Sequence, residues 1–388
     1  MGSTFKSCYI TLLKTSIGSG ALSFPYLFST YGIISTFFLT IISGGFAVVG
    51  LILYVKCAKE IGRDATLSEL AQVSMPYTRI LVDFSVFLKC FGVSLSYLII
   101  SKQLIPPIIN TLFQYNINPS VVLIIFLVLV GPFCYYKKID KLKYTSLCGV
   151  ICILFVLLGT FYRYKHTIVP DNIKIYYSTP FSRTYLGGFG KFVFSFTCHQ
   201  NIFSIHSEIS NNSFNNMKKL IFAVSLTALS LYLSFGYYNY LLYGQFVKDN
   251  IIMNFPNDIL ATIVRSLYVI VMGVSYPLQV TPCRIYLIKM LNLDFKKDSE
   301  DLIIVFVTSL VILLTYLLAI SGMNLGIVYS IIGATASTFM CLIFPALFYF
   351  NMDIERSVVV DVLGYLSFLF GVFVFSTTIY SVVYFKNK

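Results

Sequence analysis

Long hydrophobic runs separated by short polar segments dominate this sequence. A helix that crosses a lipid bilayer needs roughly 20 mostly apolar residues, and eleven runs come close to that length. They lie near residues 5–30, 33–56, 80–104, 119–136, 144–162, 185–207, 219–242, 259–283, 302–320, 325–350 and 359–384. The pattern predicts an all-α polytopic membrane protein with eleven transmembrane helices in a single domain.

The composition disfavours the soluble classes of protein. Of the 388 residues, 57% are hydrophobic and 11% are charged, whereas soluble domains carry about 25% charged residues. We therefore expect the surface of the folded protein to contact the lipid bilayer and not nucleic acid. The nine cysteines lie in or at the ends of apolar runs, so we expect free thiols that pack as small apolar groups.

The charge pattern predicts an orientation. The formal net charge of +12 comes from basic residues clustered between the runs, and most of the 28 lysines and arginines fall on the side of the N-terminus. Lys137, Lys138, Lys296 and Lys297 are examples. Cytoplasmic loops carry an excess of lysine and arginine. We expect a cytosolic N-terminus and, after an odd number of crossings, a C-terminus on the opposite side.

Two runs contain segments that weaken a helix in mid-membrane. Residues 16–20 read Ser-Ile-Gly-Ser-Gly and are followed by Pro25, and residues 197–201 read Thr-Cys-His-Gln-Asn. Both segments also have a purely structural explanation. The small residues of the first could allow close helix packing, and the histidine of the second could be a packing residue. Polar groups at this depth are costly and usually functional. We interpret both runs as broken helices whose free N–H groups can face an anion.

The positions of the breaks divide the chain into two halves. If residues 1–162 and 185–350 each form a repeat of five helices, each repeat begins with its broken helix. An odd number of crossings per half makes the repeats inverted, and substrate then binds near the midplane between the breaks. The eleventh run, 359–384, is an extra helix.

Several ionisable residues lie inside the runs. Lys14 is either a snorkelling lysine or a fixed cation within the bundle. We expect Lys89 and Lys102 to extend toward opposite faces of the membrane, and Arg265 toward the outer interface.

Enzyme and metal motifs receive little support. The spacing of His166 and Asp171 resembles one used by acyltransferases but stands alone, and His199 and His206 beside Cys198 have no second cluster to complete a metal site. No phosphate loop of the Walker type is present. We expect no catalysis, no metal and no cofactor.

Two segments resemble those of a known family. Residues 14–25 (KTSIGSGALSFP) resemble the first-span motif of the amino acid/auxin permease family, and residues 194–208 (FSFTCHQNIFSIHSE) resemble its sixth-span signature. Weaker likenesses extend the resemblance to about residue 350. The family includes sodium-coupled, proton-coupled and vacuolar amino acid transporters. The resemblance implies a five-plus-five inverted-repeat (LeuT-like) transporter fold with helices 1 and 6 broken, and alternating access.

The resemblance also implies a substrate site. The amino acid carboxylate is expected at backbone N–H groups of the first break, and the amino group at carbonyls near both breaks. The implied residues are Thr15, Gly18, Ser19, Gly20, Tyr97, Phe196 and Thr197.

Lys14 departs from the sodium-coupled members, which tend to carry asparagine there. An ammonium repels Na⁺ and could replace it between the first and eighth runs, near Ser275. A desolvated lysine can release and take up a proton. His199 is the rival carrier, because imidazole titrates near neutral pH. We therefore expect H⁺ rather than Na⁺ as the coupling ion.

These inferences predict a monomeric secondary active transporter of neutral amino acids, coupled to protons, in the plasma membrane or in a vacuolar or lysosomal membrane. Sodium symport, uncoupled exchange and an amino acid sensor on a transporter fold remain as alternatives.

Overall fold

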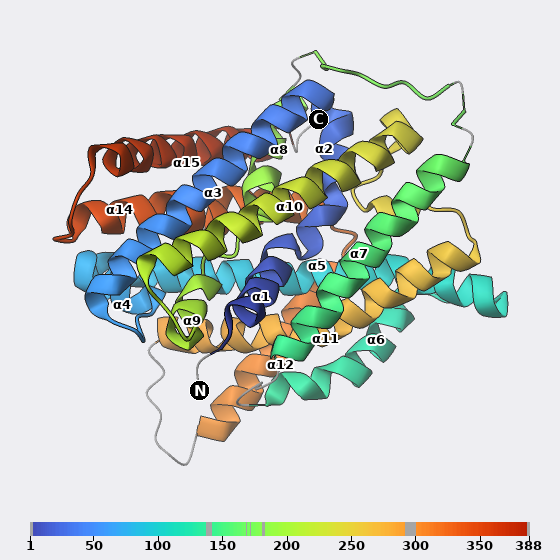
Figure 1. Cartoon of the computed structure of the whole chain (residues 1–388). Helices are drawn as coiled ribbons and strands as arrows, with labels where there is room; N and C mark the ends of the chain where they lie inside the picture. Colours follow the sequence, from blue (N-terminus) through green and yellow to red (C-terminus); the bar gives the residue numbers. More distant parts are fainter. Residues whose placement is uncertain are drawn as a thin grey trace.

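The chain folds as a bundle of helices. The computed structural model describes residues 3–136, 142–167, 169–170, 172–180, 183–291 and 300–385. The regular elements in these ranges are helices, with one isolated parallel bridge between Ser3 and Ile209. Figure 1 shows α1 (Phe5–Ile17) inside the bundle, where it packs against α7 (Leu142–His166), α9 (Asn201–Glu208) and α10 (Phe214–Tyr243).

Seven helical stretches of the described chain are long and apolar enough to cross a membrane. They include α3 (Ile33–Ile61), α5 (Arg79–Phe113), α10, α11 (Ile259–Met290), α12 (Glu300–Ile320), the run Leu325–Asn351 and most of α15 (Val358–Phe385). Each coincides with a predicted apolar run. The all-helical prediction is confirmed, and the count of eleven transmembrane helices stays a prediction.

The four other predicted runs are also helical, three of them in shorter pieces. Residues 119–136 hold α6 (Pro119–Val130) and the 3-10 turn η3 (Gly131–Tyr135), and residues 144–162 lie in α7. The first run is divided into α1, the 3-10 turn η1 (Ser19–Ser23) and α2 (Phe24–Tyr31), and the sixth into α8 (Arg183–Ser195) and α9. The remaining elements are α4 (Leu67–Ser74), η2 (Pro76–Thr78), η4 (Gly244–Phe246), η5 (Ile251–Asn254), α13 (Leu325–Ile332), the π-helical segments η6 (Gly333–Ser337) and η7 (Phe339–Ile343), and α14 (Phe344–Asn351). Four lysines of the predicted basic loops lie outside the described residues, namely Lys137, Lys138, Lys296 and Lys297.

Local backbone preferences explain the first interruption. Gly18 has φ +31° and ψ −145°, a conformation that glycine adopts without the steric cost of a Cβ. Its N–H donates to the Lys14 carbonyl at 3.1 Å, which ends α1. Pro25 lies in the first turn of α2, where a missing N–H costs nothing. In the sixth run, residues 196–200 leave the helix before α9 begins.

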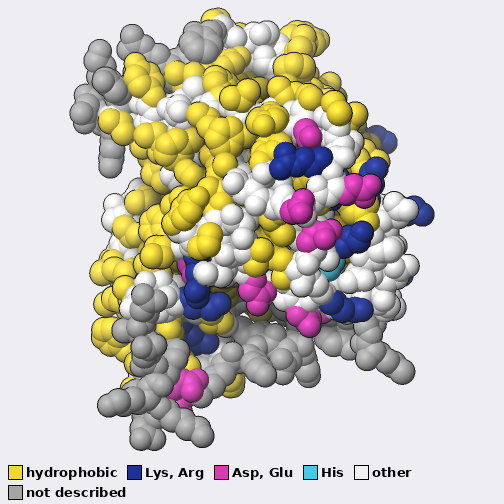
Figure 2. All heavy atoms as spheres, turned by 90° about the vertical axis from the view of Figure 1, so that its left-hand side faces the viewer, with side chains coloured by type: hydrophobic (Ala, Val, Ile, Leu, Met, Phe, Trp, Pro, Cys, Tyr) yellow, Lys and Arg dark blue, Asp and Glu magenta, His cyan; other side chains and the backbone are white. Residues whose placement is uncertain are grey.

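Large apolar side chains cover much of the outer surface. Ile34, Phe38 and Ile41 of α3 are between 53% and 64% exposed. Figure 2 shows a broad field of hydrophobic side chains beside a zone where charged side chains gather. An exposed apolar surface of this extent fits contact with lipid. The eight cysteines whose side chains are described are buried.

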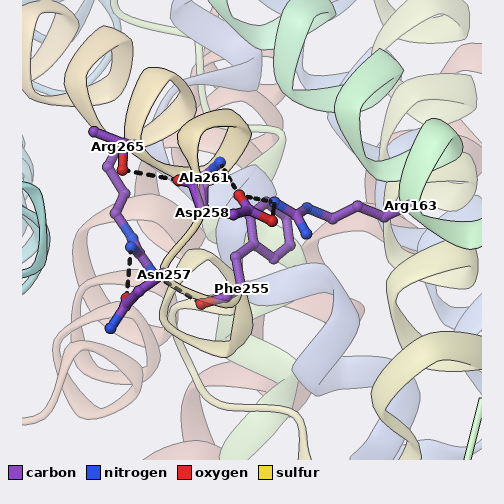
Figure 3. Close-up of polar contacts among 7 residues, drawn as sticks. Arg163, Phe255, Asn257, Asp258, Ala261 and Arg265 are labelled. Atoms are coloured by element: carbon purple, nitrogen blue, oxygen red, sulfur yellow. Dashed lines mark hydrogen bonds and ion pairs between the residues drawn. The ribbon is translucent and has the colours of Figure 1, made fainter. Parts of the chain in front are cut away.

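A polar cluster joins α7 to α11. Asp258 is the N-cap of α11, and its Oδ1 accepts a hydrogen bond from the Ala261 N–H at 2.7 Å. Arg163 donates to both oxygens of this carboxylate, at 2.7 and 2.9 Å (Figure 3). Burial alone would raise the pKa of the Asp258 carboxyl, but the bonds from Arg163 and Ala261 lower the pKa below its usual value.

The prediction that Arg265 extends to the outer interface is wrong. This side chain is 2% exposed. It donates to Asn257 Oδ1 at 2.9 Å and to the Phe255 carbonyl at 2.7 Å (Figure 3). The loop before α11 supplies these acceptors, so the guanidinium is satisfied inside the protein.

The last helix packs against a broken one. α15 contacts α8, where Thr378 Oγ1 donates to the Leu186 carbonyl at 3.3 Å. A Cβ built on Gly187 would lie 2.8 Å from Ser381 Oγ. The extra helix predicted from the sequence therefore touches the sixth run directly.

Candidate substrate site

A small polar cavity lies beside the two breaks. It has a volume of about 40 Å³. A water molecule needs about 10–15 Å³ in this measure, so an amino acid can enter only if the surrounding side chains move apart. Seven of the ten residues predicted for substrate or ion binding line it, namely Lys14, Thr15, Gly18, Ser19, Gly20, Tyr97 and Thr197.

The first break offers backbone donors to this cavity. Ser19 and Gly20 open the 3-10 turn η1, and N–H groups in the first turn of a helix have no acceptor within it. Such N–H groups, together with the positive end of the helix dipole, attract anions. The site can therefore bind a carboxylate.

The two breaks lie against each other. A Cβ built on Gly20 would lie 3.0 Å from the Ser195 Cα and 2.9 Å from its Oγ, so only glycine allows this approach. On α10, the buried Tyr232 hydroxyl lies 2.7 Å from the Ser16 carbonyl and 2.6 Å from the Ser195 carbonyl. These carbonyls end α1 and α8, and helix ends leave such groups without an internal partner. One hydroxyl thus serves both breaks.

Side chains from neighbouring helices fix the first break. Tyr329 of α13 donates to the Ser19 carbonyl at 3.0 Å, and Ser96 Oγ of α5 lies 3.4 Å from Ser19 Oγ. Asn201, at the start of α9, donates to Thr15 Oγ1 at 2.8 Å. These contacts hold the backbone of η1 in place before any ligand binds.

Lys14 connects α1 to α11. Its Nζ donates to Ser275 Oγ at 3.1 Å. Its stem crosses Gly149 of α7, where a Cβ would lie 3.1 Å from Lys14 Cγ. The ammonium therefore lies where α1, α7 and α11 meet.

Lys89 does not extend to a membrane face, so that prediction is wrong. It is 4% exposed and lines the same cavity as Lys14. Its Nζ lies 3.9 Å from the ring centroid of Phe194 and 3.4 Å from Ser337 Oγ. Residues 89, 93 and 97 are spaced by four on α5 and share one face of that helix, a signal that could have placed Lys89 beside Tyr97 from sequence alone.

Phe196 and His199 lie outside the cavity lining. The Phe196 ring packs on Gly44 of α3 and makes an edge contact with Tyr232 at 5.2 Å. His199 is fully buried, with Nε2 donating to the Ala47 carbonyl at 3.0 Å and Nδ1 lying 3.1 Å from Cys341 Sγ. Both ring nitrogens are therefore engaged by protein atoms.

Polar contacts join elements at both ends of the sixth run. Near its start, Lys191 donates to Asp249 Oδ1 at 3.3 Å, and its Nζ lies 4.3 Å from the ring centroid of Tyr26. A cavity of about 250 Å³ lies beside this pair. Just after α9, Arg63 donates to the Ile209 carbonyl at 2.6 Å.

A helical bundle with an apolar surface and two adjoining helix interruptions around a polar cavity is characteristic of polytopic membrane transporters. Residues 1–384 match the family described as transmembrane amino acid transporter protein, and the chain belongs to that family.

Curated relatives match over most of their length. "Vacuolar amino acid transporter 5" of Saccharomyces cerevisiae is 28% identical over 91% of this chain and 89% of the relative. The protein of the same name from Schizosaccharomyces pombe is 32% identical over 89% and 84%. "Sodium-coupled neutral amino acid symporter 2" of Danio rerio is 22% identical over 91% and 76%. These relatives are transporters and not enzymes.

Solved structures share the fold. The crystal structure of MhsT in complex with L-phenylalanine covers 96% of this chain and 98% of its own, with TM-score 0.59 and 12% identity. A manganese transporter of Eremococcus coleocola covers 97% and 85%, with TM-score 0.58 and 11% identity. The predicted LeuT-like architecture is confirmed at this level.

Proposed function

We propose that this protein is a proton-coupled secondary active transporter that moves amino acids across a membrane by alternating access. Lys14 carries the coupling part of the proposal. Its ammonium bonds Ser275 where α1, α7 and α11 meet, so a Na⁺ ion bound there would be repelled.

The proposal includes eleven crossings. The pair α1–α2 and the pair α8–α9 each count as one interrupted span, and α6 and α7 complete the number. Residues 1–162 and 185–350 form the two inverted repeats, with 359–384 added. The N-terminus is cytosolic and the C-terminus lies on the opposite side, and the names of the fungal relatives favour a vacuolar membrane.

The proposed substrate is an amino acid zwitterion, with neutral amino acids as the expected class. Its carboxylate meets the N–H groups of Ser19 and Gly20, and its amino group meets carbonyls near Thr15 and Thr197. A zwitterion is stabilised where opposite ends of helix dipoles converge away from water.

For proton coupling, Lys14 is a better candidate than His199. Lys14 lines the cavity and is bonded to one hydroxyl, so its proton can exchange when water enters. Both nitrogens of His199 contact Ala47 and Cys341 away from the cavity. Alternating access then requires contacts such as Lys191 with Asp249 to open and close in turn.

Uptake into proteoliposomes tests the proposal. Labelled neutral amino acids are supplied with a pH gradient or a Na⁺ gradient imposed separately. We expect accumulation with the pH gradient alone. Lys14→Asn should abolish pH-driven accumulation but retain exchange of labelled for unlabelled substrate, while the control Lys102→Asn behaves as wild type.

Each other outcome has a defined meaning. Robust pH-driven uptake by Lys14→Asn would refute the role of Lys14. Accumulation that requires Na⁺ would establish sodium symport. Binding without transport under either gradient would indicate a sensor.

A further inference from the structure

Lys89 is a buried cation with few partners. Its ammonium has three N–H donors but makes one long hydrogen bond, to Ser337 at 3.4 Å, besides its contact with the Phe194 ring. Phe194 itself stacks on Tyr329 with ring centroids 4.6 Å apart. Donors of Lys89 therefore remain for a group inside the cavity.

The cavity also has an excess of positive charge. Lys14 and Lys89 both line it, and no Asp or Glu is among its described lining residues. Carboxylates that pair with cations in the described chain lie elsewhere, at Asp83, Asp249 and Asp258. A buried charge without a partner is costly, so an anion that enters this cavity is favoured by both lysines.

We propose that Lys89 is a substrate-binding residue whose ammonium pairs with a carboxylate of the bound amino acid. The inference rests on the proposed function, because it assumes that amino acids occupy this cavity. Lys14 is already bonded to Ser275, and the Ser19 and Gly20 N–H groups offer neutral donors. Lys89 adds a charged group whose N–H donors are not all used.

Two carboxylates fit this chemistry. The first is the α-carboxylate, which Lys89 would share with the backbone of the first break. The second is the side-chain carboxylate of an acidic amino acid, whose net negative charge would offset the excess positive charge. The first assignment leaves neutral amino acids as the substrate class, and the second extends it to glutamate and aspartate.

Kinetics of the full chain in proteoliposomes test the proposal. The KM for labelled L-glutamine and for labelled L-glutamate is measured for wild type, Lys89→Met and Lys89→Arg. Lys102→Met is the matched control, because Lys102 lies on the same helix and donates to the Ala319 carbonyl outside the cavity. Gel filtration and melting temperature check folding, and Lys89→Gln replaces Lys89→Met if the latter aggregates.

A hydrogen bond to a charged group predicts that Lys89→Met raises KM about tenfold to a hundredfold. Lys89→Arg should lose less, and Lys102→Met should stay within about twofold of wild type. A rise for both substrates identifies the α-carboxylate, and a rise for glutamate alone identifies the side-chain carboxylate.

Two negative results are distinguishable. If wild type transports and neither KM changes in folded Lys89→Met, the role of Lys89 is refuted while the proposed function stands. If wild type shows neither uptake nor stabilisation by either amino acid, the proposed function fails and this inference fails with it.

Discussion

Replacing Tyr232 by phenylalanine removes a single oxygen atom that both helix breaks use. The hydroxyl lies 2.7 Å from the Ser16 carbonyl and 2.6 Å from the Ser195 carbonyl. Phenylalanine keeps the ring stacked on Phe24, at 4.3 Å between centroids, and the edge contact with Phe196. The substitution therefore isolates the hydrogen bonds from the aromatic packing.

The expected cost follows from burial. Tyr232 is 0% exposed, so water cannot replace the lost donor. A buried acceptor left without a partner costs about 1–3 kcal/mol. One O–H proton is shared between the two carbonyls, so we expect a total near that range and not twice it. For a chain of this size, that corresponds to a fall in melting temperature of about 1–4 °C.

A thiol-reactive dye gives a suitable assay, because the described cysteines are buried and react only on unfolding. The control is Tyr237→Phe on the same helix, since the Tyr237 hydroxyl has no hydrogen-bond partner among the described residues. We also expect Tyr232→Phe to raise the KM for substrate. Equal melting temperatures for the two variants would refute the bridging role of this hydroxyl.

Two further predictions concern stability. Because the folded-state pKa of Asp258 is lowered, the bridge to Arg163 stabilises the protein above the unfolded-state pKa of about 3.9 and is lost as pH falls through the folded-state value. The melting temperature of wild type should therefore exceed that of Asp258→Asn from pH 7 to about 5, and the difference should shrink as the pH falls below about 4. A difference independent of pH would contradict this. A Cβ at Gly50 would overlap the Cys341 carbonyl oxygen, whereas one at Gly45 meets nothing within 4 Å. Gly50→Ala should therefore destabilise the folded protein by about 1–3 kcal/mol or more, whereas Gly45→Ala should leave its stability unchanged. The thiol-dye assay measures both variants. Equal stabilities would disprove the close packing of α3 on η7.

The sequence predicted the helical fold because a long apolar run marks a segment in lipid, and a backbone in lipid must satisfy its own N–H and C=O groups, as a helix does. Hydropathy was less informative about where a run is interrupted. Hydropathy reads a run such as 5–30 as one span, whereas the Ser-Ile-Gly-Ser-Gly segment at 16–20 predicts the interruption that the φ of Gly18 produces. Hydropathy alone does not record that division.

The candidate site was predictable where motif and break coincide. Residues 14–20 line the cavity largely as expected, and Lys14 bonds Ser275. Lys89 and Arg265 were misplaced, because an amphipathic side chain can extend to water or turn inward, and the choice depends on acceptors from distant segments. For Arg265 these are Asn257 and Phe255.

The contact between α15 and α8 has a practical consequence for handling this protein. Thr378 and Ser381 lie against Leu186 and Gly187, on the helix α8 that leads into the break at 196–200. Shortening the last helix, or fusing a bulky reporter to it, therefore disturbs α8, which lies beside the binding cavity. Reporters are better inserted in a polar loop remote from α8.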